Sequence, residues 1–197
     1  MAYIGMRRPV MAPITAETEG SAISYGTGSV IGKAVSANLT FDVADNPDYG
    51  DDVIVNNDKG VNGYSITLET TDLTPAARAA LLGWTAVTSG TTDPVITHYQ
   101  VSDDNPPLVG FGFIRVKMDD SGARKYEGFW FHKTQFQSSA ENASTKKKQI
   151  EWNHPQVTAT GMGVYIDSSG KAKYFDWMQF DSESAAETWL NTKAGIT

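Results

Sequence analysis

The chain has 197 residues, a formal net charge of −7 and a pI of about 4.9. This length suits one domain with a sizeable core, and the acidic excess argues against sequence-independent affinity for nucleic-acid phosphates. No cysteine is present, which excludes disulfides, cysteine-ligated metals and thiol redox chemistry. No segment approaches the roughly 20 apolar residues that span a membrane, and the N-terminus resembles neither a signal peptide nor an anchor. We therefore expect a protein made and kept in the cytoplasm until it is assembled or released.

The N-terminal third predicts an arm, a strand, a loop and a second strand. Residues 1–28 mix proline, glycine and small polar residues, which indicates an extended arm. Apolar and polar residues alternate strictly over Val35–Val43, as in a strand with one buried face. One proline and several glycines then punctuate residues 45–63, which predicts a long acidic loop. Alternation resumes over Tyr64–Leu68 and predicts the second strand.

A short helix and a hairpin follow. Thr74 is a suitable N-cap, Pro75 suits the first helical position and Gly83 the end of the helix. The runs Val109–Met118 and Lys125–Phe136 are separated by turn residues around a glycine, which predicts a β-hairpin. Its apolar residues alternate imperfectly, as if both faces of the strands were covered.

The C-terminal part predicts two more strands and a helix. One strand covers Lys148–Thr160, where Pro155 marks a bend, bulge or edge, and a weaker one surrounds Tyr174–Met178. Ser184 and Glu187 form a capping-box pattern for the final helix. The whole pattern predicts one domain over residues 1–197, a mainly β fold (an antiparallel β sandwich or open barrel) with two short α-helices.

Two segments come close to ligand-binding motifs and fail. The run Gly26–Ala34 resembles a phosphate-binding loop, but Ala34 replaces the hydroxyl residue that would bind Mg²⁺. Asp58–Glu69 matches a calcium loop at several positions, yet Gly60 replaces one ligand and no helix flanks the segment. We interpret the second segment as a turn leading into a strand. The sequence predicts no catalytic residue, cofactor or metal.

The histidines and aromatic residues leave one alternative open. His98, His132 and His154 have no metal-ligand spacing, and His132 is expected to be packed or at an interface. The aromatic side chains are expected in the core or in subunit contacts, although they could also form a sugar-stacking platform. That platform would make the protein a carbohydrate- or receptor-binding β-sandwich module. It would use Tyr126, Phe129, Trp130, Phe131 and Trp152.

With the enzyme motifs excluded, the order of features along nearly the whole chain becomes informative. An arm, YIGMRRPVMAPI, precedes a strand and acidic loop, GKAVSANLTFDVADNPDYGDD. A strand, helix and Gly-Trp follow in SITLETTDLTPAARAALLGW. The hairpin LVGFGFIRVKMDDSGARKYEGFWFHKTQF and the strand KKKQIEWNHPQVTATGMGVY complete the pattern. In this order the chain resembles the major tail proteins, or tail tube proteins, of long-tailed, siphovirus-like bacteriophages.

This resemblance implies a structural virion protein. Subunits of that family form hexameric rings that stack into the tail tube, where a hairpin or strand pair from each subunit joins its neighbours around the lumen. Arms and long loops bridge the rings. The implied partners are the tape measure, tail terminator and tail tip proteins and the passing double-stranded DNA, without a membrane. The implied location is the virion tail, after assembly in the host cytoplasm. A tube protein of a bacterial contractile injection machine would have the same architecture.

The resemblance assigns candidate contact residues. We expect the acidic loop to reach the next ring and to meet basic residues there, while a negative lumen lets DNA slide without binding. We expect the central hairpin to form the ring. The acidic candidates are Asp45, Asp48, Asp51, Asp52 and Asp58; the basic ones are Lys146, Lys147, Lys148, Arg7 and Arg8; the hairpin ones are Phe111, Phe113, Arg115, Phe129 and Phe131.

Overall fold

The computed structural model describes residues 2–88, 96–99, 105–139 and 152–197. These residues form a mainly antiparallel β structure with two helices, which confirms the predicted fold class. The strands are β1 Ala2–Ala16, β2 Ser24–Tyr25, β3 Ser29–Val30, β4 Ala34–Gly50, β5 Val53–Thr70, β6 Thr85–Thr88, β7 Ile96–Tyr99, β8 Leu108–Met118, β9 Arg124–Ser138, β10 Gln156–Gly161 and β11 Phe175–Phe180. The helices are α1 Pro75–Leu82 and α2 Glu183–Ala194.

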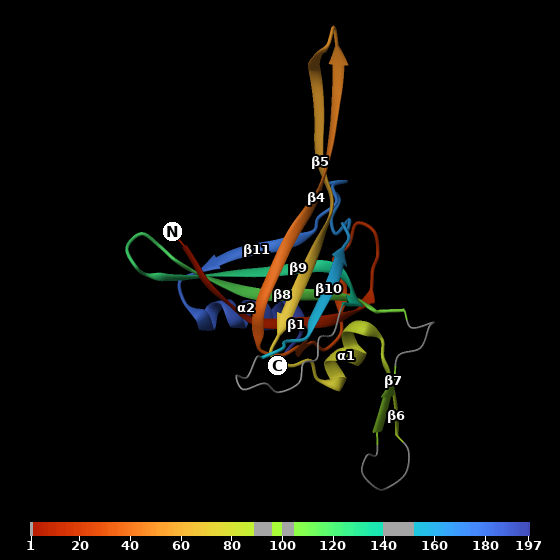
Figure 1. The fold of residues 1–197 in the computed structure, drawn as a ribbon, viewed down its shortest axis with the longest axis vertical. Coiled ribbons are helices and arrows are strands. Elements are labelled where there is room, and N and C mark those ends of the chain that lie inside the picture. The colour runs from red at the N-terminus through yellow and green to blue at the C-terminus, as the bar shows by residue number, and fades with distance from the viewer. Residues whose placement is uncertain (1, 89–95, 100–104, 140–151) are drawn as a thin grey trace.

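The main sheet folds back on itself. Its strand order is β2-β1-β8-β9-β10-β5-β4, and β9 carries two partners on one side. Residues Tyr126–Phe131 of β9 pair with β11, and Thr134–Ser138 pair with β10. Figure 1 shows β4 and β5 crossing in front of β8 and β9, so that the sheet forms two layers. The short strands β6 and β7 form a separate hairpin.

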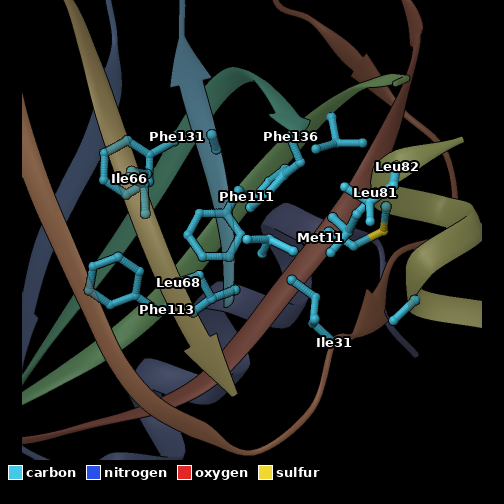
Figure 2. Close-up of a cluster of buried hydrophobic side chains, with 14 of the residues drawn as sticks. Met11, Ile31, Ile66, Leu68, Leu81, Leu82, Phe111, Phe113, Phe131 and Phe136 are labelled. Atoms are coloured by element: carbon cyan, nitrogen blue, oxygen red, sulfur yellow. The ribbon is translucent and has the colours of Figure 1, made fainter. Parts of the chain in front are cut away.

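The larger core lies between these layers (Figure 2). Phe111 and Phe131 are fully buried at its centre, with rings 6.2 Å apart. Ile66 and Leu68 of β5 cover them, and α1 closes one side. The alternation in β5 therefore has the predicted cause, since one face of this strand is buried against the central hairpin.

A second core fills the opposite face of the sheet, beneath α2. Trp130, Ile114 and Leu190 are fully buried there. Gly112 makes this packing possible, because a Cβ at this position would lie 2.6 Å from a methyl carbon of Leu190. Strands β8 and β9 are thus covered on both faces, as their imperfect alternation predicted.

The predicted helix ends are confirmed for α1 and corrected for α2. Thr74 accepts a hydrogen bond from the Ala77 amide at 3.2 Å, and Gly83 ends α1 in the left-handed conformation. In α2 the N-cap is Ser182, which accepts from the Ala185 amide, whereas Ser184 lies inside the helix. Ser182 takes this role because the backbone is still extended there, directly after β11 ends.

Two segments expected to be irregular are strands. The predicted N-terminal arm contains β1, which pairs with β8 from Ala2 to Pro13 and is interrupted by bulges. The predicted loop over residues 45–63 continues β4 and β5 as a paired hairpin. Gly5 and Pro9 lie at bulges of β1, and Pro47 and Gly60 lie on ribbon strands that have a free edge, so these residues do not prevent pairing. The strand predicted over Lys148–Thr160 corresponds to β10, which begins only at Gln156, directly after Pro155. Residues 152–155 are irregular, and residues 148–151 lie outside the described residues.

Candidate functional site

The most unusual feature is the distal part of the β4–β5 hairpin, residues 43–62, which we call the ribbon. Strand β10 pairs with β5 only as far as Gly161, opposite Tyr64. Beyond that point β4 and β5 pair only with each other within the described chain, and they extend away from the body of the molecule (Figure 1). An isolated two-stranded hairpin is only marginally stable in water, so the ribbon is a structure that a partner would stabilise.

The sequence at the tip explains how the ribbon closes. Asp51 and Asp52 have φ angles of 49° and 65°, the left-handed conformation required at both central residues of a type I′ turn. Aspartate tolerates this conformation better than most residues. The pairing register shifts twice on the β5 side, at Asn62 and at Val55, so β4 keeps a regular alternation along the whole ribbon.

This alternation gives the ribbon two different faces. On one face Val43 lies opposite Val61, and Tyr49 lies opposite Ile54. The side chains of Tyr49 and Ile54 are 64% and 58% exposed. We call this the apolar face; it continues the face of β4 and β5 that is buried in the core further down.

The opposite face, which we call the acidic face, carries polar and negative side chains. Asp48 lies opposite Asn56, and Asp58 lies opposite Asn46. Asp45 differs from these residues, because it points to the apolar face and its carboxylate lies 3.3 Å from the Lys59 ammonium. The five candidate aspartates are therefore gathered on one ribbon, but they are distributed over both faces and the turn.

Arg7 and Arg8, the basic candidates that the structure describes, contact α2 and not the ribbon within the subunit. Arg7 contacts Glu183 at 2.5 Å, and the Arg8 guanidinium donates to the Asn191 side chain at 3.0 Å. Arg8 has a φ of 49° at a β1 bulge, and both arginines hold α2 against the sheet. Lys146, Lys147 and Lys148 lie outside the described residues.

The hairpin candidates belong mainly to the core of the subunit. Phe111, Phe113, Phe129 and Phe131 are all buried in the larger core. Strand β1 pairs with β8, and β11 and β10 pair with successive parts of β9. The outer edges of β8 and β9 are therefore occupied by strands of the same subunit wherever these pairs are formed. This arrangement does not support the expectation that the central hairpin joins neighbouring subunits by edge pairing. Among the described strands, free edges occur on the ribbon, on β4 and β11, and on the short strands β2, β3, β6 and β7.

Arg115 lies in a charged cluster at one end of the sheet. Its guanidinium carbon lies 3.8 Å from the centre of the Tyr3 ring, and it contacts the Glu127 carboxylate at 2.7 Å. Lys117 contacts the other oxygen of Glu127 at 2.8 Å. Burial alone raises the pKa of Glu127, but the hydrogen bonds from Lys117 and Arg115 outweigh it and hold that pKa below its usual value. A buried carboxylate thus meets two cations, which leaves one positive charge in excess.

Two neighbours of this cluster were missed by the sequence reasoning. Trp177 of β11 lies opposite Phe129, on the same face as Arg115, and is 51% exposed. Tyr3 lies opposite Lys117 and is also exposed. The strands around Tyr174–Met178 and over Lys125–Phe136 were both predicted, but their pairing with each other was not, so the exposed face of β11 could not be identified. We call this surface of Tyr3, Arg115, Lys117 and Trp177 the open end of the sheet.

The suggested sugar platform is not formed. Trp130 is fully buried beneath α2, and Phe129 and Phe131 are in the larger core on the other face. Trp152 is 80% exposed but lies outside the sheet. His132 is buried as expected, with Nε2 3.3 Å from the Asp176 carboxylate. Phe129, Trp130 and Phe131 therefore serve the two cores, and the five platform residues share no common surface.

No protein-family model matches this sequence, and no curated protein is significantly similar to it. Among the described residues, no three His, Asp or Glu side chains come together as metal ligands. No helix in the described part of the chain is long and apolar enough to cross a membrane.

Proposed function

We propose that this protein is a structural subunit that assembles with copies of itself, and more specifically that it builds the tail tube of a long-tailed bacteriophage. The ribbon is the observation that supports the proposal best. It carries an apolar face, free strand edges and a tip far from the core, all of which need a partner. A protein that stayed monomeric would risk aggregation through this ribbon.

The resemblance in the order of sequence features supports the more specific assignment. In that role the subunits form hexameric rings that stack into a tube. The partners are the tape measure protein, the tail terminator and the tail tip proteins. DNA passes through the tube during ejection without specific binding, and the net charge of −7 agrees with a lumen that repels phosphates. The protein then resides in the virion tail after assembly in the host cytoplasm.

The binding-module alternative has less support. Its aromatic platform would need Trp130, which is fully buried. A tube protein of a contractile injection machine has the same architecture, and nothing in the described residues separates it from a phage protein.

Negative-stain electron microscopy of the purified protein over a range of concentrations tests the proposal. We expect rings or hollow tubes with a central pore, and a matching rise in mass by light scattering. Uniform monomers at every concentration, also after addition of the tape measure protein, would contradict self-assembly. Compact oligomers without a pore would contradict the tube while leaving self-association intact.

A further inference from the structure

We propose that the apolar face of the ribbon of one subunit packs against the open end of the sheet of a second copy. This inference rests on the proposed self-assembly and assigns the two surfaces that make the contact. It also replaces the earlier expectation that charged residues of the acidic loop carry the contact.

The first support comes from contacts within the subunit. Just below the ribbon, the same face of β4 and β5 packs against β9 and β11. The rings of Phe41 and Phe175 lie 5.9 Å apart, and those of Tyr64 and Phe131 lie 4.9 Å apart. The molecule therefore already contains one example of this face of β4–β5 resting on the aromatic face of β9–β11.

Both surfaces continue beyond the part that the subunit covers itself. On β4 and β5 the row of apolar side chains that contains Phe41 and Tyr64 continues into the ribbon. There its members Val43, Val61 and Ile54 are exposed. On β11 the row continues from Phe175 to Trp177, two residues along the same face. Each surface is thus covered in one part within the subunit and open in another, and apolar side chains continue from the covered part into the open part.

The ribbon cannot cover the open end of its own sheet. It extends away from the body, whereas β11 ends on the other side of the crossing, near the β8–β9 turn (Figure 1). A second copy of the chain can supply the missing layer. Because the two surfaces differ, the contact is heterologous, and such contacts generate rings or filaments rather than closed pairs.

The charges agree with this pairing. The ribbon carries five aspartates and one lysine between residues 43 and 62. Asp48 and Asp58 lie on the acidic face and Asp45 is paired with Lys59, so the negative charge that can meet the open end is that of Asp51 and Asp52 at the turn. The open end carries Arg115 and Lys117 around the single buried carboxylate of Glu127, which leaves a positive excess. Attraction between these surfaces would orient the second copy, while apolar contact supplies most of the stabilisation. The acidic face, with Asp48 and Asp58, then stays in water.

The absence of native cysteines allows a direct test by cross-linking. Two single variants, Ile54→Cys and Trp177→Cys, are mixed and treated with a short bismaleimide. We expect a dimer that contains one chain of each variant. The matched control is Asn56→Cys mixed with Trp177→Cys, because Asn56 lies on the acidic face of the same strand. Equal cross-linking from Asn56 and Ile54 would overturn the assignment of the face.

Charge substitutions provide a second measurement. Ile54→Lys is expected to raise the concentration needed for assembly by about tenfold or more, whereas Asn56→Lys is expected to change it little. Ile54 is exposed, so circular dichroism is expected to show an unchanged fold. If the unmodified protein assembles but tolerates both Ile54→Lys and Trp177→Lys, the pairing is wrong and self-assembly stands. If the unmodified protein never assembles, both proposals fail. Binding of the apolar face to phosphatidylcholine vesicles without self-association would also overturn the inference.

Discussion

At the scale of single residues, Gly161 is important because the Tyr64 ring packs directly over it at the base of the ribbon. A Cβ at this position would lie 1.8 Å from the Tyr64 ring. That ring cannot move easily, because its hydroxyl is hydrogen bonded to Thr134 and to the Lys133 carbonyl. We expect Gly161→Ala to lower the free energy of unfolding by about 1–3 kcal/mol, measured by urea denaturation.

Gly60→Ala is the matched control for this substitution. Gly60 also lies in a strand, and no atom lies within 4 Å of a Cβ built there. The free energy of unfolding is expected to change by less than about 0.5 kcal/mol. Similar effects at both positions would contradict the steric explanation and point to a general cost of losing glycine.

Asp176 gives the clearest dependence on pH. His132 and Lys193 favour its ionised form against the opposing effect of burial, so the pKa of Asp176 lies well below its usual value. A lowered carboxyl pKa stabilises the fold above the pKa of the unfolded state, and this stabilisation is lost as the pH falls further. Asp176→Asn is expected to cost about 1 kcal/mol near pH 7, because the carboxylate is partly exposed and screened.

Thermal unfolding of both proteins between pH 2 and pH 7 measures this effect. The difference in melting temperature is expected to be constant down to about pH 4 and to shrink below it, as this carboxyl group becomes protonated in the unfolded chain while it is still ionised in the folded protein. A difference that stays constant over the whole range would show that Asp176 acts through shape and not through charge.

At the scale of elements, the sequence predicts best the segments whose pattern has one local cause. The strand over Val35–Val43 and the caps of α1 are confirmed, because strand and helix geometry act over a few residues. The buried face expected for that strand is wrong in part, since Val35, Phe41 and Val43 are exposed at the edge of the sheet. The ribbon was predicted as a loop because Pro47 and Gly60 usually interrupt strands. In a two-stranded ribbon with free edges, a missing amide at an outer edge costs no ladder hydrogen bond, so the usual rule does not apply.

The ribbon is expected to be dispensable for folding of the body. A variant in which residues 43–62 are replaced by Asn-Gly joins Asp42 to Gly63, which already lie opposite each other. An Asn-Gly pair closes a type I′ hairpin, and the removed side chains contribute little to either core. We expect the free energy of unfolding to change by less than about 1 kcal/mol, with complete loss of self-assembly.

Chemical denaturation and light scattering check the two parts of this prediction separately. A folded variant that still forms rings or tubes would exclude the ribbon from the contact between subunits. An unfolded variant would show that the ribbon stabilises the body itself. The longer variant that keeps residues 43–48 and 56–62 around the same turn would then locate the part that is needed.

At the scale of the whole molecule, the candidate surfaces could not be predicted because they depend on contacts between distant segments. Trp177 and Tyr3 are exposed on one surface only because β11 and β1 flank the central hairpin from opposite sides. The contact of Arg7 with Glu183 could not be predicted either, because α2 lies at the other end of the chain. Composition gave the acidic character of the ribbon, but only the strand register divides its charges between two faces.

The heterologous contact leads to a prediction for mixtures of defective subunits. The ribbon-deleted variant keeps the open end, whereas Trp177→Lys keeps the ribbon and alters the open end. Neither variant can extend an assembly alone, but each retains the surface that the other lacks. We expect a one-to-one complex that does not grow further, because its remaining surfaces are the two altered ones.

Analytical ultracentrifugation of the separate proteins and of their mixture measures this directly, with the chain lengths distinguishing the components. A symmetric contact would behave differently, since a subunit without a ribbon would then bind no partner at all. Monomers in the mixture would therefore contradict the pairing of ribbon and open end, whereas a stable one-to-one complex would exclude the symmetric alternative.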